Sequence, residues 1–169
     1  DSGRTLNLEQ GNILFHSPKG KGGGTIKSGG VSAAVLGTTL IVSATADGGF
    51  KVILLEGKGS VTLANGETVM LKGGQMVYVL PSGAKFSEVL TINLEKLVAG
   101  SLLVSGFSHP LPSTMLIQQA ANGQNIMVAG AGGTNQLVGV ANGGRTVDPG
   151  SYQTAARPPL SFKEYGVLA

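Results

Sequence analysis

The sequence contains no cysteine, few aromatic residues and little charge. Without cysteine the chain can form no disulfide bond, no thiolate metal site and no cysteine nucleophile, although this does not fix its compartment. Aromatic residues make up 5% of the chain, so platforms on which bases could stack are scarce. The net charge of +3 comes from basic and acidic residues scattered singly along the chain. Since no basic stripe is present, we predict no nucleic-acid partner.

The sequence also lacks a long hydrophobic run. A membrane-spanning helix needs about 18 or more consecutive apolar residues. The longest apolar stretch, Leu97–Phe107, is shorter and contains Gly100 and Gly106. We therefore expect no transmembrane segment. The first residue, Asp1, fits either a cleaved signal peptide or a trimmed chain.

Few residues are of the types that act in catalysis or bind metal ions. The histidines, His16 and His109, are far apart in sequence, and the acidic residues occur singly rather than in catalytic pairs. The glycine-rich run Gly20–Thr25 lacks the Lys-Ser/Thr ending of a phosphate-binding loop, and Asp47–Gly49 lacks the further ligands of a calcium loop. We therefore predict no catalytic residue, no metal site and no cofactor, and we expect that the chain is not an enzyme.

Glycine and apolar residues dominate what is present. Glycine accounts for 28 of 169 residues and hydrophobic residues for 41%, a composition typical of a turn-rich β protein. Short alternating apolar segments, separated by turns such as Asp47–Gly49 and Asn65–Gly66, predict β-strands. The fold class we expect is mainly β, a sandwich, roll or small barrel of short antiparallel strands with one or two short helices in the second half. Strands are expected within Arg4–Phe15 and near Gly24–Lys27, Ala33–Leu36, Thr39–Ala46, Phe50–Glu56, Gly59–Ala64, Glu67–Leu71 and Gln75–Leu80.

The composition changes at Pro81. We expect residues 1–80 to form a β domain that includes an N-terminal strand segment. Residues 81–169 should form a helical connector, glycine-rich strands and an extended tail that packs on the same domain or on a neighbouring subunit. Leucines within Ser87–Ser105 have helical spacing, with Asn93 as the expected N-cap. A second helix, two strands and an extended tail are expected at Thr114–Ala121 (stopped by Asn122–Gly123), Ile126–Val128, Gln136–Ala141 and from Thr146 onward.

Residues 25–79 resemble a FecR-type extracytoplasmic β domain. The motifs that carry the resemblance occur in the order and spacing of that family; they are Ile26–Gly29, Ala34–Thr38, Val52–Leu55, Glu56–Gly57, Ser60–Leu63 and Gly74–Gln75. The resemblance implies an all-β fold and a location outside the cytoplasm, in the periplasm, at the cell surface or in the extracellular space. It also implies structural roles for Gly37 and Gly57, at a tight corner and a bulge. Because the β pattern starts within the first ten residues, the chain is more similar to stand-alone exported proteins of the bacterial cell envelope than to membrane-anchored signalling members.

The segment between Lys96 and Arg145 contains no Asp, Glu, Lys or Arg. Such a neutral stretch is buried either within its own chain or against a neighbour. We expect a homo-oligomer or polymer, such as an extracellular filament, formed by self-association or strand addition at Arg4–Leu8 and Phe162–Leu168. The residues predicted to contact another subunit are Leu6, Leu8, Leu97, Leu102, Phe107, Ile126, Val128, Phe162, Tyr165 and Leu168.

Two alternative functions are open at this point. The first is a FecR-like cell-surface signalling or sensor module that binds an envelope protein. The second is a module that binds a small molecule or a glycan, which the scarcity of aromatic residues disfavours.

Overall fold

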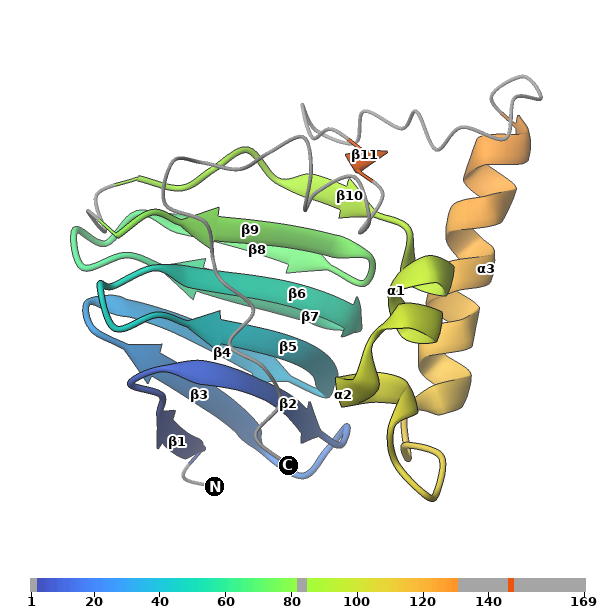
Figure 1. Ribbon diagram of the computed structural model, residues 1–169, viewed down its shortest axis with the longest axis horizontal. Helices are drawn as coiled ribbons and strands as arrows, with labels where there is room; N and C mark the ends of the chain where they lie inside the picture. Colours follow the sequence, from blue (N-terminus) through green and yellow to red (C-terminus); the bar gives the residue numbers. More distant parts are fainter. Residues whose placement is uncertain (1–2, 82–84, 131–145, 148–169) are drawn as a thin grey trace.

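Figure 1 shows a computed structural model of the chain, which describes residues 3–81, 85–130 and 146–147. Two β-sheets pack face to face, and three helices gather at one end of them. Sheet A has the order β1-β3-β4-β7-β8, formed by β1 (Arg4–Asn7), β3 (Gly23–Ser28), β4 (Val31–Leu36), β7 (Lys58–Thr62) and β8 (Thr68–Lys72). Sheet B has the order β11-β10-β9-β6-β5-β2, formed by β2 (Gly11–Ser17), β5 (Thr38–Ala44), β6 (Phe50–Glu56), β9 (Gln75–Val79), β10 (Leu90–Ile92) and β11 (Thr146–Val147). The helices are α1 (Leu94–Gly100), α2 (Leu102–Ser105) and α3 (Thr114–Gly130).

The prediction of a mainly β fold is confirmed. Every strand expected between residues 4 and 80 is present, within two residues of its predicted bounds, and the segment Arg4–Phe15 contributes to two strands, β1 and β2. Neighbouring strands pair antiparallel except at β1–β3 and β10–β11, which are parallel. The described strands form two open sheets and do not close into a barrel.

Single glycines carry the chain from one sheet to the other. Gly37 lies between β4 and β5, and Gly57 lies between β6 and β7, both with positive φ (64° and 84°). A Cβ on Gly57 would lie 2.7 Å from the Thr38 Oγ1 and 2.8 Å from the Gly37 carbonyl oxygen, so a larger residue would force the two corners apart. Both glycines are structural, as the resemblance implied, but both form corners. The β-bulge lies beside Gly57, where the register of β5 and β6 shifts.

The main core lies between the two sheets. It is built from alternate side chains of each strand, because successive residues of a strand point to opposite faces. The largest of them are Phe50, Ile26, Leu40 and Leu54, each no more than 1% exposed. A second apolar cluster lies on the outer face of sheet B, under the helices, and includes Leu55 and Leu94.

The second half differs from the prediction in two places. The leucines of Ser87–Ser105 do not form one helix, because Leu90–Ile92 pairs with β9 in sheet B as β10. The helix begins at Leu94 and is interrupted at Ser101, which gives α1 and α2.

The second difference concerns the helix expected to stop at Asn122–Gly123. Helix α3 continues to Gly130 through the segment Ile126–Val128, so the strand predicted there is wrong. Docking against sheet B outweighs the penalty of about 1 kcal/mol for a glycine inside a helix. The strand predicted at Gln136–Ala141 and most of the tail lie outside the described residues, and the division of the chain at residue 80 stays a prediction.

Candidate protein-binding surface

A hydrogen-bonded row of polar side chains crosses sheet B near its helical end. The register places His16, Thr39 and Glu56 side by side on β2, β5 and β6. The Thr39 hydroxyl donates to Glu56 Oε1 at 2.7 Å, and its oxygen lies 2.8 Å from His16 Nδ1. Because the single hydroxyl proton is used toward Glu56, Nδ1 of His16 is the donor to Thr39.

This row is buried. Thr39 is 0% and Glu56 is 3% exposed, so a substrate has no access to the hydroxyl or the carboxylate. The β-bulge next to Glu56 brings its side chain onto the same face as Thr39. The row therefore satisfies a buried carboxylate and joins three strands.

The other polar groups offer no stronger chemical site. His109 is exposed in the connection between α2 and α3, where its Nδ1 lies 3.1 Å from the Ser108 Oγ. Across the described residues, no group of three or more His, Cys, Asp or Glu is placed to hold a metal ion. None of the described helices is long and apolar enough to span a membrane.

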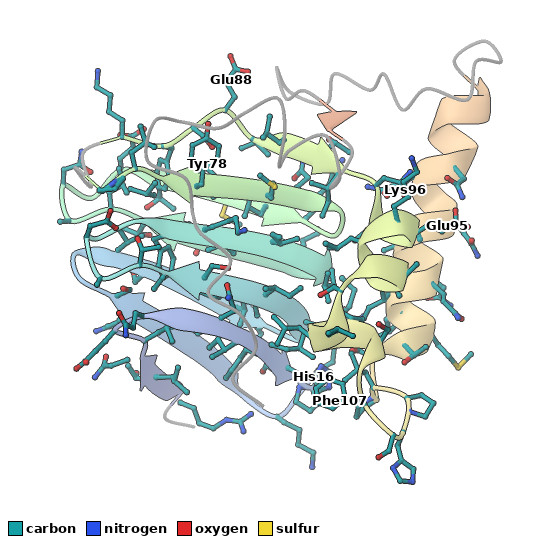
Figure 2. All side chains as sticks on the ribbon, viewed as in Figure 1. His16, Tyr78, Glu88, Glu95, Lys96 and Phe107 are labelled. Carbon is teal, nitrogen blue, oxygen red and sulfur yellow. The ribbon has the colours of Figure 1, made fainter. Side chains whose placement is uncertain are left out.

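The helical end starts at a well-formed cap. The Asn93 side chain accepts a hydrogen bond from the Lys96 backbone N–H at 2.9 Å, and Glu95 lies in the first turn of α1. The predicted N-cap is therefore confirmed. Leu94, directly after the cap, is 0% exposed and fixes α1 against sheet B. Glu95 and Lys96 point away from the strands (Figure 2).

One side chain of α3 fastens this helix to the ends of β9 and β10 in sheet B. Gln124 Nε2 donates to the carbonyl oxygens of Ile92 at 2.8 Å and Gly74 at 3.3 Å, and its Oε1 accepts from the Leu94 N–H at 3.2 Å. A Cβ on Gly74 would meet the Gln124 side-chain amide, so a larger residue at that position would displace it. We call these contacts the Gln124 latch.

The apolar residues of the charge-free segment that follows Lys96 divide into two sets. Those that pack against the outer face of sheet B are Leu97, Val98, Leu103, Val104, Leu111, Ile117, Ala120 and Ala121. The second set faces solvent: Leu102 on α2 is 67% exposed, Phe107 in the following connection 53%, and Met115 in the first turn of α3 74%. We call Leu102, Phe107 and Met115 the α2–α3 surface.

The structure places the residues predicted to contact another subunit in different environments. Leu102 and Phe107 are exposed, as a contact residue must be, and Leu6 on the edge strand β1 is 39% exposed. Leu8 and Leu97 are half-buried against the two apolar clusters of their own chain. Ile126 and Val128 lie on α3, whereas Phe162, Tyr165 and Leu168 lie outside the described residues.

Sequence reasoning missed four large exposed apolar residues: Met115, Leu36 on β4, Met70 on β8 and Leu80 after β9. Their exposure depends on which face of a helix or strand is covered, and an isolated Met or Leu in the sequence carries no such signal.

Comparison with known proteins gives limited matches. No family model and no curated protein matches the chain. Two crystal structures of a candidate anti-sigma factor from Parabacteroides distasonis ATCC 8503 are similar in part. One has 15% identity and a TM-score of 0.48, covering 56% of this chain and 44% of the other. The second has 14% identity and a TM-score of 0.47, covering 59% and 48%.

The chain thus spans less than half the length of these neighbours. At this identity and TM-score the likeness assigns the chain to no family, and the resemblance to FecR-type domains stays a prediction. The class that the observed fold defines is a two-sheet β protein with a helical end.

Proposed function

We propose that this chain is a non-enzymatic binding module that recognises another protein through the α2–α3 surface. The observation that carries the proposal is the exposure of Leu102, Phe107 and Met115 on a segment that contains no charged residue. A segment without charged residues that exposes large apolar side chains is typical of a surface that another protein covers.

The size of this surface favours a reversible contact. Most apolar side chains of the helices are already used against sheet B, which leaves Leu102, Phe107 and Met115. Burial of each would contribute about 1.5–3 kcal/mol, and association itself consumes several kcal/mol of that gain. A few central anchors of this kind suit a transient complex better than the large apolar interface of an obligate polymer.

A partner in the bacterial cell envelope agrees with the FecR-type resemblance of residues 25–79. Under this proposal the domain acts outside the cytoplasm as a sensor or relay, and its rigid sheets hold the helical end toward the partner. The Gln124 latch supports this role, because it fixes α3 to sheet B by hydrogen bonds to Ile92, Gly74 and Leu94.

Self-association is the second candidate function. It is favoured by β2, which forms one edge of sheet B and pairs with β5 along its whole length of seven residues. The outer side of such an edge can accept another strand. The segment Arg4–Asn7, by contrast, is paired with β3 of its own chain.

The absence of cysteine makes a direct test possible. Single-cysteine variants Phe107→Cys and, as a matched control in the exposed turn between β7 and β8, Asn65→Cys would carry a photoactivatable cross-linker. The variants would be expressed in the source bacterium, and cross-linked products would be identified by mass spectrometry. Light scattering of the purified chain would give its oligomeric state.

We expect Phe107→Cys to cross-link to a different protein of the envelope, Asn65→Cys not to do so, and the purified chain to be monomeric. A cross-link between two copies, together with an oligomer in solution, would favour the second candidate. No cross-link at Phe107 above the Asn65 control would contradict both.

A further inference from the structure

The outer face of sheet A is a surface that the proposed function leaves unused. In β3, β4, β7 and β8, the residues that point inward include Ile26, Val35, Val61 and Leu71, all buried in the main core. Their neighbours in sequence therefore point outward. The helices pack on sheet B, so this face of sheet A stays free among the described residues.

The register gives this face an unusual composition. Its charged residues are Lys27, Lys58 and Lys72, and none of its residues on these four strands is Asp or Glu. Leu36 and Met70, which are 68% and 65% exposed, lie on the same face. The remaining side chains are small Ser, Thr and Ala. We call this surface the lysine face.

Two of the lysines are placed against each other. Lys58 and Lys72 are direct partners in the antiparallel pair β7–β8, and the pairing of Val35 with Gly59 puts Leu36 beside Lys58. Like charges directly opposite each other destabilise a sheet. No carboxylate of the described residues forms an ion pair with either lysine. A locally unfavourable arrangement of this kind is expected where a surface has a function.

We propose that the lysine face binds a second protein partner, one that presents carboxylate side chains around apolar ones. Carboxylates of the partner would neutralise Lys27, Lys58 and Lys72. Its apolar side chains would cover Leu36 and Met70. A partner with acidic side chains alone would leave these two residues exposed. The small Ser, Thr and Ala residues between them allow a flat partner to approach closely.

The composition disfavours two other anionic partners. Nucleic acid would leave Leu36 and Met70 uncovered, and the face offers no aromatic residue on which bases could stack. An anionic membrane would have to accept the polar Ser and Thr side chains between the strands, with only two large apolar residues to insert. The lysine face lies on sheet A and the α2–α3 surface on helices packed against sheet B, so neither proposal depends on the other.

The test uses the full chain and a defined probe. A fluorescent peptide of alternating Glu and Leu would be titrated with the chain, and binding would be followed by fluorescence anisotropy. The test variant is Lys27→Glu/Lys58→Glu/Lys72→Glu. The control, Lys21→Glu/Lys85→Glu/Lys96→Glu, changes the net charge equally at positions outside the lysine face.

We expect the triple change on the lysine face to weaken peptide binding about tenfold or more, with the control close to the unaltered chain. Leu36→Ser/Met70→Ser should weaken binding as well, without reducing its dependence on salt. Circular dichroism would confirm that each variant is folded, and Lys→Gln changes at the three lysines would replace any variant that is not.

Three results would overturn the proposal. The first is no binding of the Glu-Leu peptide, and the second is equal loss in the two triple variants. The third is tighter binding of oligo(dT) or phosphatidylserine vesicles that only the lysine-face variant abolishes, which would assign the face to nucleic acid or membrane. None of these results bears on the cross-link at Phe107.

Discussion

The outer faces of the two sheets have opposite characters. On β5 of sheet B every residue is buried, on both faces of the strand. On β4 of sheet A buried residues alternate with exposed or half-buried ones. Both strands contribute to the same inner core, so the difference lies entirely in what covers the outside.

In this fold the outer face of one sheet packs against the helices, and the outer face of the other sheet is left exposed for binding. Sheet B uses its outer face to hold the helices, through an apolar cluster that includes Ile41, Ile53 and Leu94. The helices then present the α2–α3 surface. Sheet A contributes one face to the core and leaves the other, with Lys58, Lys72 and their neighbours, in contact with solvent.

The largest expected effect is on the free energy of unfolding, and it compares a leucine under the helices with a leucine on the outer face of sheet A. Leu94→Ala should lower the free energy of unfolding by about 2–5 kcal/mol, because Leu94 is fully buried under the helical end. Leu36→Ala, on the lysine face, should change it by less than about 0.5 kcal/mol. Urea unfolding followed by circular dichroism measures both. Equal losses in the two variants would show that the outer face of sheet A is covered.

A smaller effect on stability is expected at the Gln124 latch. It can be measured by substituting two glycines that have similar φ values, Gly66 and Gly74. Gly66→Ala, at φ 88° with no atom near its Cβ, should cost only the strain of a left-handed residue, about 1–2 kcal/mol. Gly74→Ala, at φ 82°, meets the Gln124 side chain as well and should cost about 1–3 kcal/mol more. Thermal unfolding compares them. If the two changes cost the same, the latch contributes nothing to stability.

The smallest effect concerns the paired lysines. Lys58→Glu converts a like-charged pair with Lys72 into an opposite-charged one and should stabilise the fold by about 0.2–1 kcal/mol. Lys21→Glu, in the loop between β2 and β3, makes the same charge change away from that pair and serves as the control. Chemical denaturation at low salt gives both values. A loss of stability in Lys58→Glu relative to the control would contradict the predicted repulsion.

Much of the first half could be predicted from the sequence, because its strands and turns are local. Alternation of apolar residues defined strands such as Phe50–Glu56, and Asn65–Gly66 marked a hairpin. The Asn93 cap was also predictable, since an N-cap is set by residues within one turn.

The second half depended on contacts between distant residues. The spacing of Leu90 and Leu94 fits a helix, but Leu90 pairs with β9 and becomes part of a strand. Asn122–Gly123 normally ends a helix, but α3 continues, and Gln124 bonds to the ends of β9 and β10. Such bonds join residues 32 to 50 positions apart, and no local pattern predicts them.

The candidate surfaces were predicted only in part. Leu102 and Phe107 were among the predicted contact residues, whereas Met115, which lies in the same charge-free stretch, was not. The lysine face could not be predicted, because it requires both the strand order and the knowledge that the helices pack on the other sheet.

The most direct test of this account measures cysteine labelling at two methionine positions that point outward from the two sheets. Met70→Cys lies on the outer face of sheet A, where Met70 is 65% exposed, and Met76→Cys lies on the outer face of sheet B, where Met76 is 3% exposed. In the native protein Met70→Cys should react with a thiol reagent at nearly its rate in urea, and Met76→Cys should be strongly protected. Equal native labelling rates at the two positions would contradict the difference between the two faces on which both proposals depend.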